Sequence, residues 1–211
     1  MSGLILSYYY VKQYPDGMEL PECARLFIIE GIAGSGKSTF HNQLKSELEE
    51  RGFLIYDFSE EELLFSWKHA WIKGIEEVRL DYMNRLLDYC KEILDSTPSS
   101  AFIFSRFHIS FDVLAVKTSP KTTKRYKKLI QRVKEMPAHI YVPVLDEHEI
   151  EDRCIHSERS DKTWRMHLGR RLETRGFSRL KDMYVWEQDR ILSLLKAQGI
   201  SYTTLRIGYK Q

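Results

Sequence analysis

The chain has 211 residues, 43% of them hydrophobic and 29% charged, which favours one globular domain with a terminal extension or a lid. The formal net charge of +2 does not require a nucleic-acid partner, and the three scattered cysteines exclude a disulfide framework or a zinc site of the usual spacing. No apolar stretch approaches the roughly 20 residues needed to cross a bilayer, and the first ten residues make a poor signal peptide, so we expect a soluble cytoplasmic enzyme.

Residues 1–24 are interpreted as an N-terminal extension or hairpin, and residues 25–211 as one domain. Short apolar runs bounded by turn residues predict strands at 25–30, 53–58, 101–105, 139–144 and 200–207. Apolar residues at helical spacing predict helices at 37–51, 147–156 and 178–198, and pairs of helices over 60–95 and 108–135. Residues 157–176 are expected to be irregular. Strands alternating with helices predict an α/β fold with a parallel sheet, whose fourth strand ends near Pro143.

The segment from Gly31 to Ser38 fits the pattern G-x-x-x-x-G-K-[ST] without a mismatch, and it lies between a predicted strand and a predicted helix. The glycines let successive backbone N–H groups point into one concavity that holds phosphate oxygens, and the helix adds the positive end of its dipole. Lys37 would bridge the terminal phosphates, and the Ser38 hydroxyl would hold Mg²⁺. We therefore predict that Mg²⁺-ATP is bound by Gly31, Ala33, Gly34, Ser35, Gly36, Lys37, Ser38 and Thr39.

Three segments resemble the thymidylate kinase and deoxynucleoside kinase group of P-loop kinases. Residues 30–39 look like its phosphate-loop signature, residues 105–110 resemble its Asp-Arg or Glu-Arg motif followed by a serine, and residues 153–159 resemble its arginine-bearing lid. The resemblance implies a three-layer P-loop kinase fold, with a five-stranded parallel sheet flanked by helices and a mobile lid near 153–170. It also implies transfer of the ATP γ-phosphoryl group to a nucleoside or nucleoside monophosphate.

The same resemblance assigns catalytic roles to three arginines. Arg106 would contact the phosphate or the 5′ end of the acceptor, while Arg153 and Arg159 would close over the transferring group. These roles make physical sense, because the transition state spreads negative charge over oxygens that a planar guanidinium can bind.

The residues that would bind the acceptor are less clearly marked. Trp67, Arg79 and Tyr82 lie in the segment that faces the acceptor in this group, and an aromatic ring there could stack on a base. Aromatic residues at helical spacing more often belong to a hydrophobic core. The glutamine with which deoxynucleoside kinases read the base is not found.

The sequence departs from the group at its acidic positions. Ser105 stands where the group has an acidic residue before the motif arginine, and the glutamate-proline pair after the second strand is missing. Asp57 or Glu60 could act as the base, and Asp57 could hold magnesium together with Ser38, since a carboxylate at the carboxyl end of a strand faces the crevice. In the alternative interpretation, which we favour for the glutamates, Ser59 caps a helix whose first turn contains them.

Two alternatives stay open. The acceptor could be another small alcohol, or the chain could be a nucleotide-binding or ATPase module that acts through residues 117–134, which contain eight basic residues and no acidic one. We favour a solvated helix surface for that segment, and a capping box for Asp146 and Glu149 over an ATPase motif. The expected partners are ATP and a small-molecule acceptor, with no membrane and no nucleic acid, and a homodimer is left open.

Overall fold

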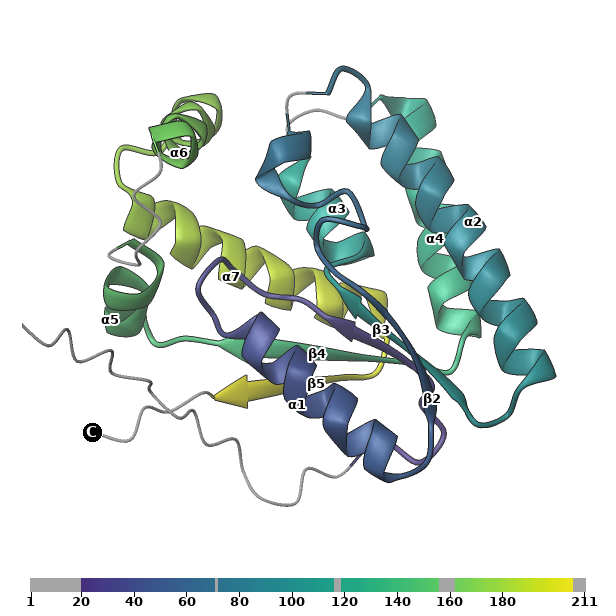
Figure 1. Ribbon diagram of the computed structural model, residues 1–211. Helices are drawn as coiled ribbons and strands as arrows, with labels where there is room; N and C mark the ends of the chain where they lie inside the picture. The colour runs from purple at the N-terminus through teal and green to yellow at the C-terminus, as the bar shows by residue number, and fades with distance from the viewer. Residues whose placement is uncertain (1–19, 71, 116–118, 156–161, 207–211) are drawn as a thin grey trace, which may run out of the picture.

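The computed structural model describes residues 20–70, 72–115, 119–155 and 162–206, so the predicted extension over 1–19 and the predicted lid residue Arg159 lie outside it. Within this part, five parallel strands form one sheet in the order β2-β3-β1-β4-β5 (Figure 1). The strands are β1 (Leu26–Ile29), β2 (Leu54–Phe58), β3 (Ser100–Ser105), β4 (Ala138–Val144) and β5 (Tyr202–Arg206). The predicted α/β fold with a five-stranded parallel sheet is therefore confirmed.

Helices cover both faces of the sheet, which gives the fold three layers (Figure 1). The helices are α1 (Lys37–Glu50), the 3-10 turn η1 (Trp67–His69), α2 (Ile75–Ser96), α3 (His108–Leu114), α4 (Pro120–Glu135), α5 (Glu147–Ile150), the π-helical turn η2 (Glu151–Ile155), α6 (Lys162–Arg175) and α7 (Leu180–Gln198). Because side chains alternate along a strand, Phe27 and Ile29 of β1 pack with α1, whereas Leu26 and Ile28 belong to the larger core beneath α2, α3, α4 and α7.

Pro143 lies inside β4, one residue before the strand ends, although a proline cannot donate a ladder hydrogen bond. The Tyr141 carbonyl accepts from Glu30 N on the β1 side, at 2.9 Å, while Ile140 N donates to Ser201 O on the β5 side, at 3.0 Å. Alternate residues of β4 thus face alternate neighbours, and Pro143 faces the β1 side. The β1–β4 pairing ends at Tyr141, so no ladder donor is lost at Pro143.

The structure corrects the prediction in two segments. Residues 60–64 form a turn and η1 is only three residues long, where a helix was expected before Gly74. Leu64 has a φ of 62°, a left-handed conformation that a right-handed helix cannot continue. Residues 162–175, expected to be irregular, form α6 with Trp164 and Leu168 buried. The apolar residues of α6 are too few among its charged ones for the periodicity to be evident.

Two predicted helix starts agree with the structure. Asp146 and Glu149 form the expected capping box at the start of α5. The predicted break in residues 108–135 separates α3 from α4, where Ser119 Oγ accepts from Thr122 N at 3.1 Å. Among the described residues, no helix combines the length and apolar character needed to cross a membrane.

Candidate functional site

The turn between β1 and α1 brings the backbone of the phosphate loop close to its neighbours. Gly31, Gly34 and Gly36 have φ values of 144°, 78° and 95°, a region that other residues rarely adopt. A Cβ atom on Gly34 would lie 2.7 Å from the carbonyl oxygen of Arg153, and one on Gly31 would lie 2.9 Å from Ser35 Oγ. The loop therefore needs glycine at Gly31 and Gly34 for both conformation and space, and at Gly36 for conformation.

Two polar side chains of the loop are set inside it. Ser35 is fully buried, and its Oγ has no hydrogen-bond partner within the described part of the chain. Lys37 is 8% exposed, and its Nζ donates to the Ile32 carbonyl oxygen at 2.8 Å. Gly36 caps α1 without a side-chain hydrogen bond, and the first turn of α1 contains no acidic residue. A phosphate group in the loop would supply the hydrogen-bond partner that the Ser35 hydroxyl lacks among the described residues.

Glu30, which comes just before the loop, holds the next strand end in position. Its carboxylate is fully buried and accepts hydrogen bonds from Phe107 N at 2.8 Å and from Ser110 N at 3.2 Å. Burial raises the pKa of Glu30, against the effect of these hydrogen bonds and of Arg106. Arg106 itself has a φ of 72°, and its backbone N–H donates to the Ile29 carbonyl oxygen at 2.9 Å. This role of Glu30 was not predicted, because it depends on residues 77 and 80 positions away.

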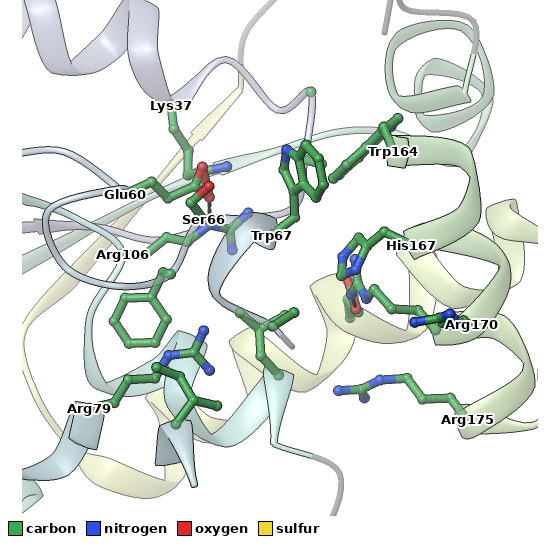
Figure 2. A pocket seen from close by; sticks show the side chains of 18 of the residues that line it. Lys37, Glu60, Ser66, Trp67, Arg79, Arg106, Trp164, His167, Arg170 and Arg175 are labelled. Carbon is green, nitrogen blue, oxygen red and sulfur yellow. Dashed lines mark hydrogen bonds and ion pairs between the residues drawn. The ribbon is translucent and has the colours of Figure 1, made fainter. Parts of the chain in front are cut away.

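The side chain of Arg106 forms an ion pair with Glu60, which follows β2. Arg106 Nη1 also lies 3.3 Å from Ser110 Oγ. Figure 2 shows Glu60, Arg106 and Lys37 gathered at one end of a cavity. Of the three adjacent glutamates, Glu60 therefore belongs to the site, while Glu61 pairs with Lys68 and Glu62 caps Ser59 N at 2.7 Å. The interpretation of Ser59 as a helix cap is wrong, because residues 60–64 form a turn and not a helix, although Ser59 and Glu62 do exchange the two hydrogen bonds of such a cap.

This cavity has a volume of about 380 Å³ and runs from the phosphate loop to α6. Its walls come from the phosphate loop, the segment from Glu60 to Ala70, the start of α2, and the inner side of α6. Of the predicted acceptor residues, Trp67 and Arg79 line it, whereas Tyr82 is half-buried and packs against the main core. The side chains from α6 were not predicted. They are Trp164, His167, Arg170, Arg171, Thr174 and Arg175.

A second cavity beside Lys37 and Ser38 contains Asp57, His41 and Ser105. His41 Nδ1 lies 2.7 Å from Ser105 Oγ, and its Nε2 lies 3.4 Å from Asp57 Oδ2. Burial lowers the pKa of His41, although Asp57 opposes that shift. Burial alone would raise the pKa of Asp57, but hydrogen bonds and charge from Lys45 and His41 hold it below its usual value. Asp57 is therefore ionised and already engaged by two basic side chains.

The predicted lid begins directly on the phosphate loop. The Arg153 carbonyl group packs against Gly34, and Cys154 Sγ donates to Ala33 O at 2.8 Å. The Arg153 side chain is buried and lies 3.6 Å from a Glu149 oxygen. Arg153 is thus placed beside the loop, but it does not line the cavity that contains Glu60 and Arg106.

A family model described as the KAP family P-loop domain matches residues 20–161. No curated protein matches this chain. Among solved structures, the chain is similar to the YorR protein of Bacillus subtilis in complex with phosphorylated GDP, with 20% identity over 85% of this chain and 84% of that one, at a TM-score of 0.51. It is also similar to APE1195, with 13% identity, 82% and 95% coverage and a TM-score of 0.42. Deoxyadenosine kinase from M. mycoides, with products dCMP and a flexible dCDP bound, has 12% identity, 87% and 90% coverage and a TM-score of 0.47. The expected three-layer fold of P-loop kinases is thereby confirmed.

Proposed function

We propose, from the premise that this chain belongs to the KAP family of P-loop domains, that it transfers the γ-phosphoryl group of Mg²⁺-ATP to a nucleoside or nucleoside monophosphate. The observation that carries this proposal is one cavity in which Lys37 of the phosphate loop and the Glu60–Arg106 ion pair meet. A nucleotide loop alone would suit any P-loop protein. A carboxylate and a guanidinium beside it suit a reaction with a second substrate.

Nucleotide binding would rest on the loop from Gly31 to Thr39. Its cradle leaves no room for side chains at Gly31 and Gly34, and the buried Ser35 hydroxyl supports an oxyanion ligand. Lys37 would exchange its bond to the Ile32 carbonyl for the terminal phosphates. Ser38 would hold Mg²⁺, with Asp57 in the adjoining cavity as the nearby carboxylate. Magnesium would neutralise charge on the phosphates during transfer.

Glu60 is the better candidate for the base that accepts a proton from an acceptor hydroxyl. Its carboxylate lines the same cavity as Lys37, and its partner Arg106 fixes its direction. Asp57 is less suited to this role, because it lines the second cavity and not the one that contains Arg106. Arg106 would also bind the acceptor end that receives the phosphoryl group.

On the opposite wall, α6 would complete the site as part of the lid. Arg170 and Arg175 line the cavity from α6, and Trp164 packs near Trp67, with ring centroids 6.0 Å apart. The proposed closing role of Arg153 has weaker support, because its side chain is buried beside Glu149. That of Arg159 stays a prediction.

A second candidate function is nucleotide hydrolysis without an acceptor, which the match to an NTPase family model favours. The nucleic-acid surface that this function would use, predicted over residues 117–134, has less support. Arg125 pairs with Glu77 and Asp81 of α2, and Arg132 pairs with Asp88, so part of the basic helix α4 is neutralised within the fold. The remaining lysines suit a solvated surface.

The test is ADP release from Mg²⁺-ATP in the presence of single nucleosides and nucleoside monophosphates. The proposal expects one acceptor class to stimulate release strongly over the background. A fast rate that no acceptor alters would instead support the hydrolysis function.

A further inference from the structure

Arg79 of α2 is a buried cation whose terminal groups are not used by the fold. It is 5% exposed, its Nε donates to the Leu64 carbonyl oxygen at 2.8 Å, and its guanidinium lies 5.0 Å from the centre of the Phe65 ring. These two contacts fix its orientation. Neither Nη atom has a hydrogen bond or ion pair to any residue in the described part of the chain. Figure 2 shows the guanidinium of Arg79 directed into the cavity.

The charges that line the cavity are unbalanced in favour of the cations. The basic residues are Lys37, Arg79, Arg106, Arg170, Arg171 and Arg175, and the carboxylates are Glu60, Glu76 and Glu187. Glu60 and Glu187 form ion pairs with Arg106 and Arg171. Among the described lining residues, Glu76 is then the remaining carboxylate, and its charge acts on Arg79 without forming an ion pair with it. A buried positive charge such as that of Arg79 is stabilised by an anionic ligand.

Arg79 does not lie where phosphoryl transfer would occur. Lys37, Glu60 and Arg106 lie together at one end of the cavity, and Arg79 lies at the other, across from Arg175 (Figure 2). The phosphates of ATP would occupy the end at Lys37. A carboxylate base at that end suits an acceptor that reacts through a hydroxyl group, since a phosphate acceptor is already ionised.

We propose that the acceptor carries two groups: a hydroxyl that receives the phosphoryl group near Glu60, and a phosphate monoester at its other end that Arg79 binds. This inference rests on the proposed kinase function and narrows its substrate class. The planar fork of a guanidinium matches the oxygens of a phosphate in a bidentate contact. A nucleoside 3′-monophosphate with a free 5′-hydroxyl has this chemistry. A nucleoside lacks the phosphate, and a nucleoside 5′-monophosphate lacks the free 5′-hydroxyl.

The experiment compares adenosine, adenosine 3′-monophosphate and adenosine 5′-monophosphate as acceptors of the full-length protein, together with the same three forms of the other bases. We expect kcat/KM for the preferred 3′-monophosphate to exceed that of its nucleoside by about 10- to 100-fold, as one charged hydrogen-bonded contact gives. The product should be the 3′,5′-bisphosphate, identified by mass. Equal use of the nucleoside, or preferred conversion of the 5′-monophosphate to the diphosphate, would overturn the inference while the kinase function stands.

Variants of Arg79 test the contact itself. Arg79→Gln should abolish the preference for the 3′-phosphate without changing KM for ATP, and Arg79→Lys should restore part of it. Arg85→Gln, an exposed position on the same helix, is the matched control. Equal losses for the nucleoside and its 3′-phosphate, with a lowered melting temperature, would mean a structural role and overturn the inference.

Equilibrium binding separates this inference from the proposed function. Binding of the 3′-monophosphates and nucleosides is measured with Mg²⁺ and a non-hydrolysable ATP analogue. Tighter binding of a 3′-monophosphate that Arg79→Gln removes would support the Arg79 site even without turnover, and in that case only the kinase function would fail. Absence of any such difference would overturn the inference.

Discussion

His41 Nδ1 lies 2.7 Å from Ser105 Oγ, at the carboxyl end of β3 and directly beside the phosphate loop. Ser105 occupies the position at which the resembling kinases have an acidic residue. His41 connects it to Asp57 on the neighbouring strand β2, at 3.4 Å. A serine, a histidine and an aspartate thus stand at this strand end in place of one carboxylate, and they position polar groups next to Lys37 and Ser38.

Removing His41 should weaken catalysis more than nucleotide binding. His41→Ala would leave Ser105 and Asp57 unconnected, and loss of a buried hydrogen-bonded group costs about 1–3 kcal/mol. If that cost falls on the transition state, kcat should decrease about tenfold, with a smaller change in KM for ATP. Steady-state kinetics would show this, with Asn42→Ala, an exposed neighbour in the same cavity, as the control. An unchanged kcat would mean that the connection has no role in the reaction.

Lys37→Ala should abolish nucleotide-dependent activity while the fold persists. The Lys37 ammonium donates to the Ile32 carbonyl group of its own loop at 2.8 Å and lines the cavity, while the hydrophobic core is built from other residues. Loss of a charge-assisted contact to phosphate should lower kcat/KM by at least about 100-fold. Kinetics and a thermal melt, with the exposed Ser46→Ala on α1 as the control, would check this. Retained activity would place the nucleotide elsewhere.

Glu60→Gln should lower kcat and leave ATP binding nearly intact. The amide keeps the size of the side chain but cannot take a proton, and general-base catalysis contributes roughly 10²- to 10⁴-fold. Glu61→Gln is the matched control, because Glu61 is exposed and pairs with Lys68 outside the Glu60–Arg106 pair. A similar loss in both variants, or in neither, would argue against Glu60 as the base.

Stability should decrease in mild acid, and His108 is one of the side chains responsible. This side chain is fully buried, its Nε2–H donates to Gln198 Oε1 at 3.0 Å, and burial lowers its pKa to about 4. A histidine that is neutral when folded, with a pKa near 6.5 when unfolded, contributes stability above pH 6.5. That contribution is lost progressively as the pH falls from about 6.5 to the folded-state pKa of about 4.

At pH 5 the loss from His108 amounts to roughly 2 kcal/mol relative to pH 7. Urea unfolding at the two pH values, for the unmodified protein and for His108→Gln, measures it. The variant should show a smaller difference between the two pH values. Burial also lowers the pKa values of His139 and His167 to about 4, which adds to the acid sensitivity of both proteins. An identical pH dependence in the two proteins would show that His108 does not titrate as described.

Local signals in the sequence were enough to predict the sheet, the phosphate loop and several helix caps. The phosphate loop and the capping box of α5 are each formed by residues close together in the sequence. Their sequence patterns therefore predicted the structure that is observed. The connections of Glu30 to Phe107 and of Glu60 to Arg106 were not predictable, since they join residues 77 and 46 positions apart. The contribution of α6 was missed because its many charged residues obscured the helical pattern that buries Trp164 and Leu168.

The fate of the γ-phosphoryl group tests the central claim most directly. The protein is incubated with Mg²⁺ and γ-³²P-labelled ATP together with the acceptor panel, and the label is partitioned between organic product and inorganic phosphate. The account predicts that with the correct acceptor most of the label appears in an organic phosphate ester, and that Glu60→Gln reduces this transfer. Label found only in inorganic phosphate, at a rate that no acceptor changes, would contradict the account and identify the chain as a hydrolase.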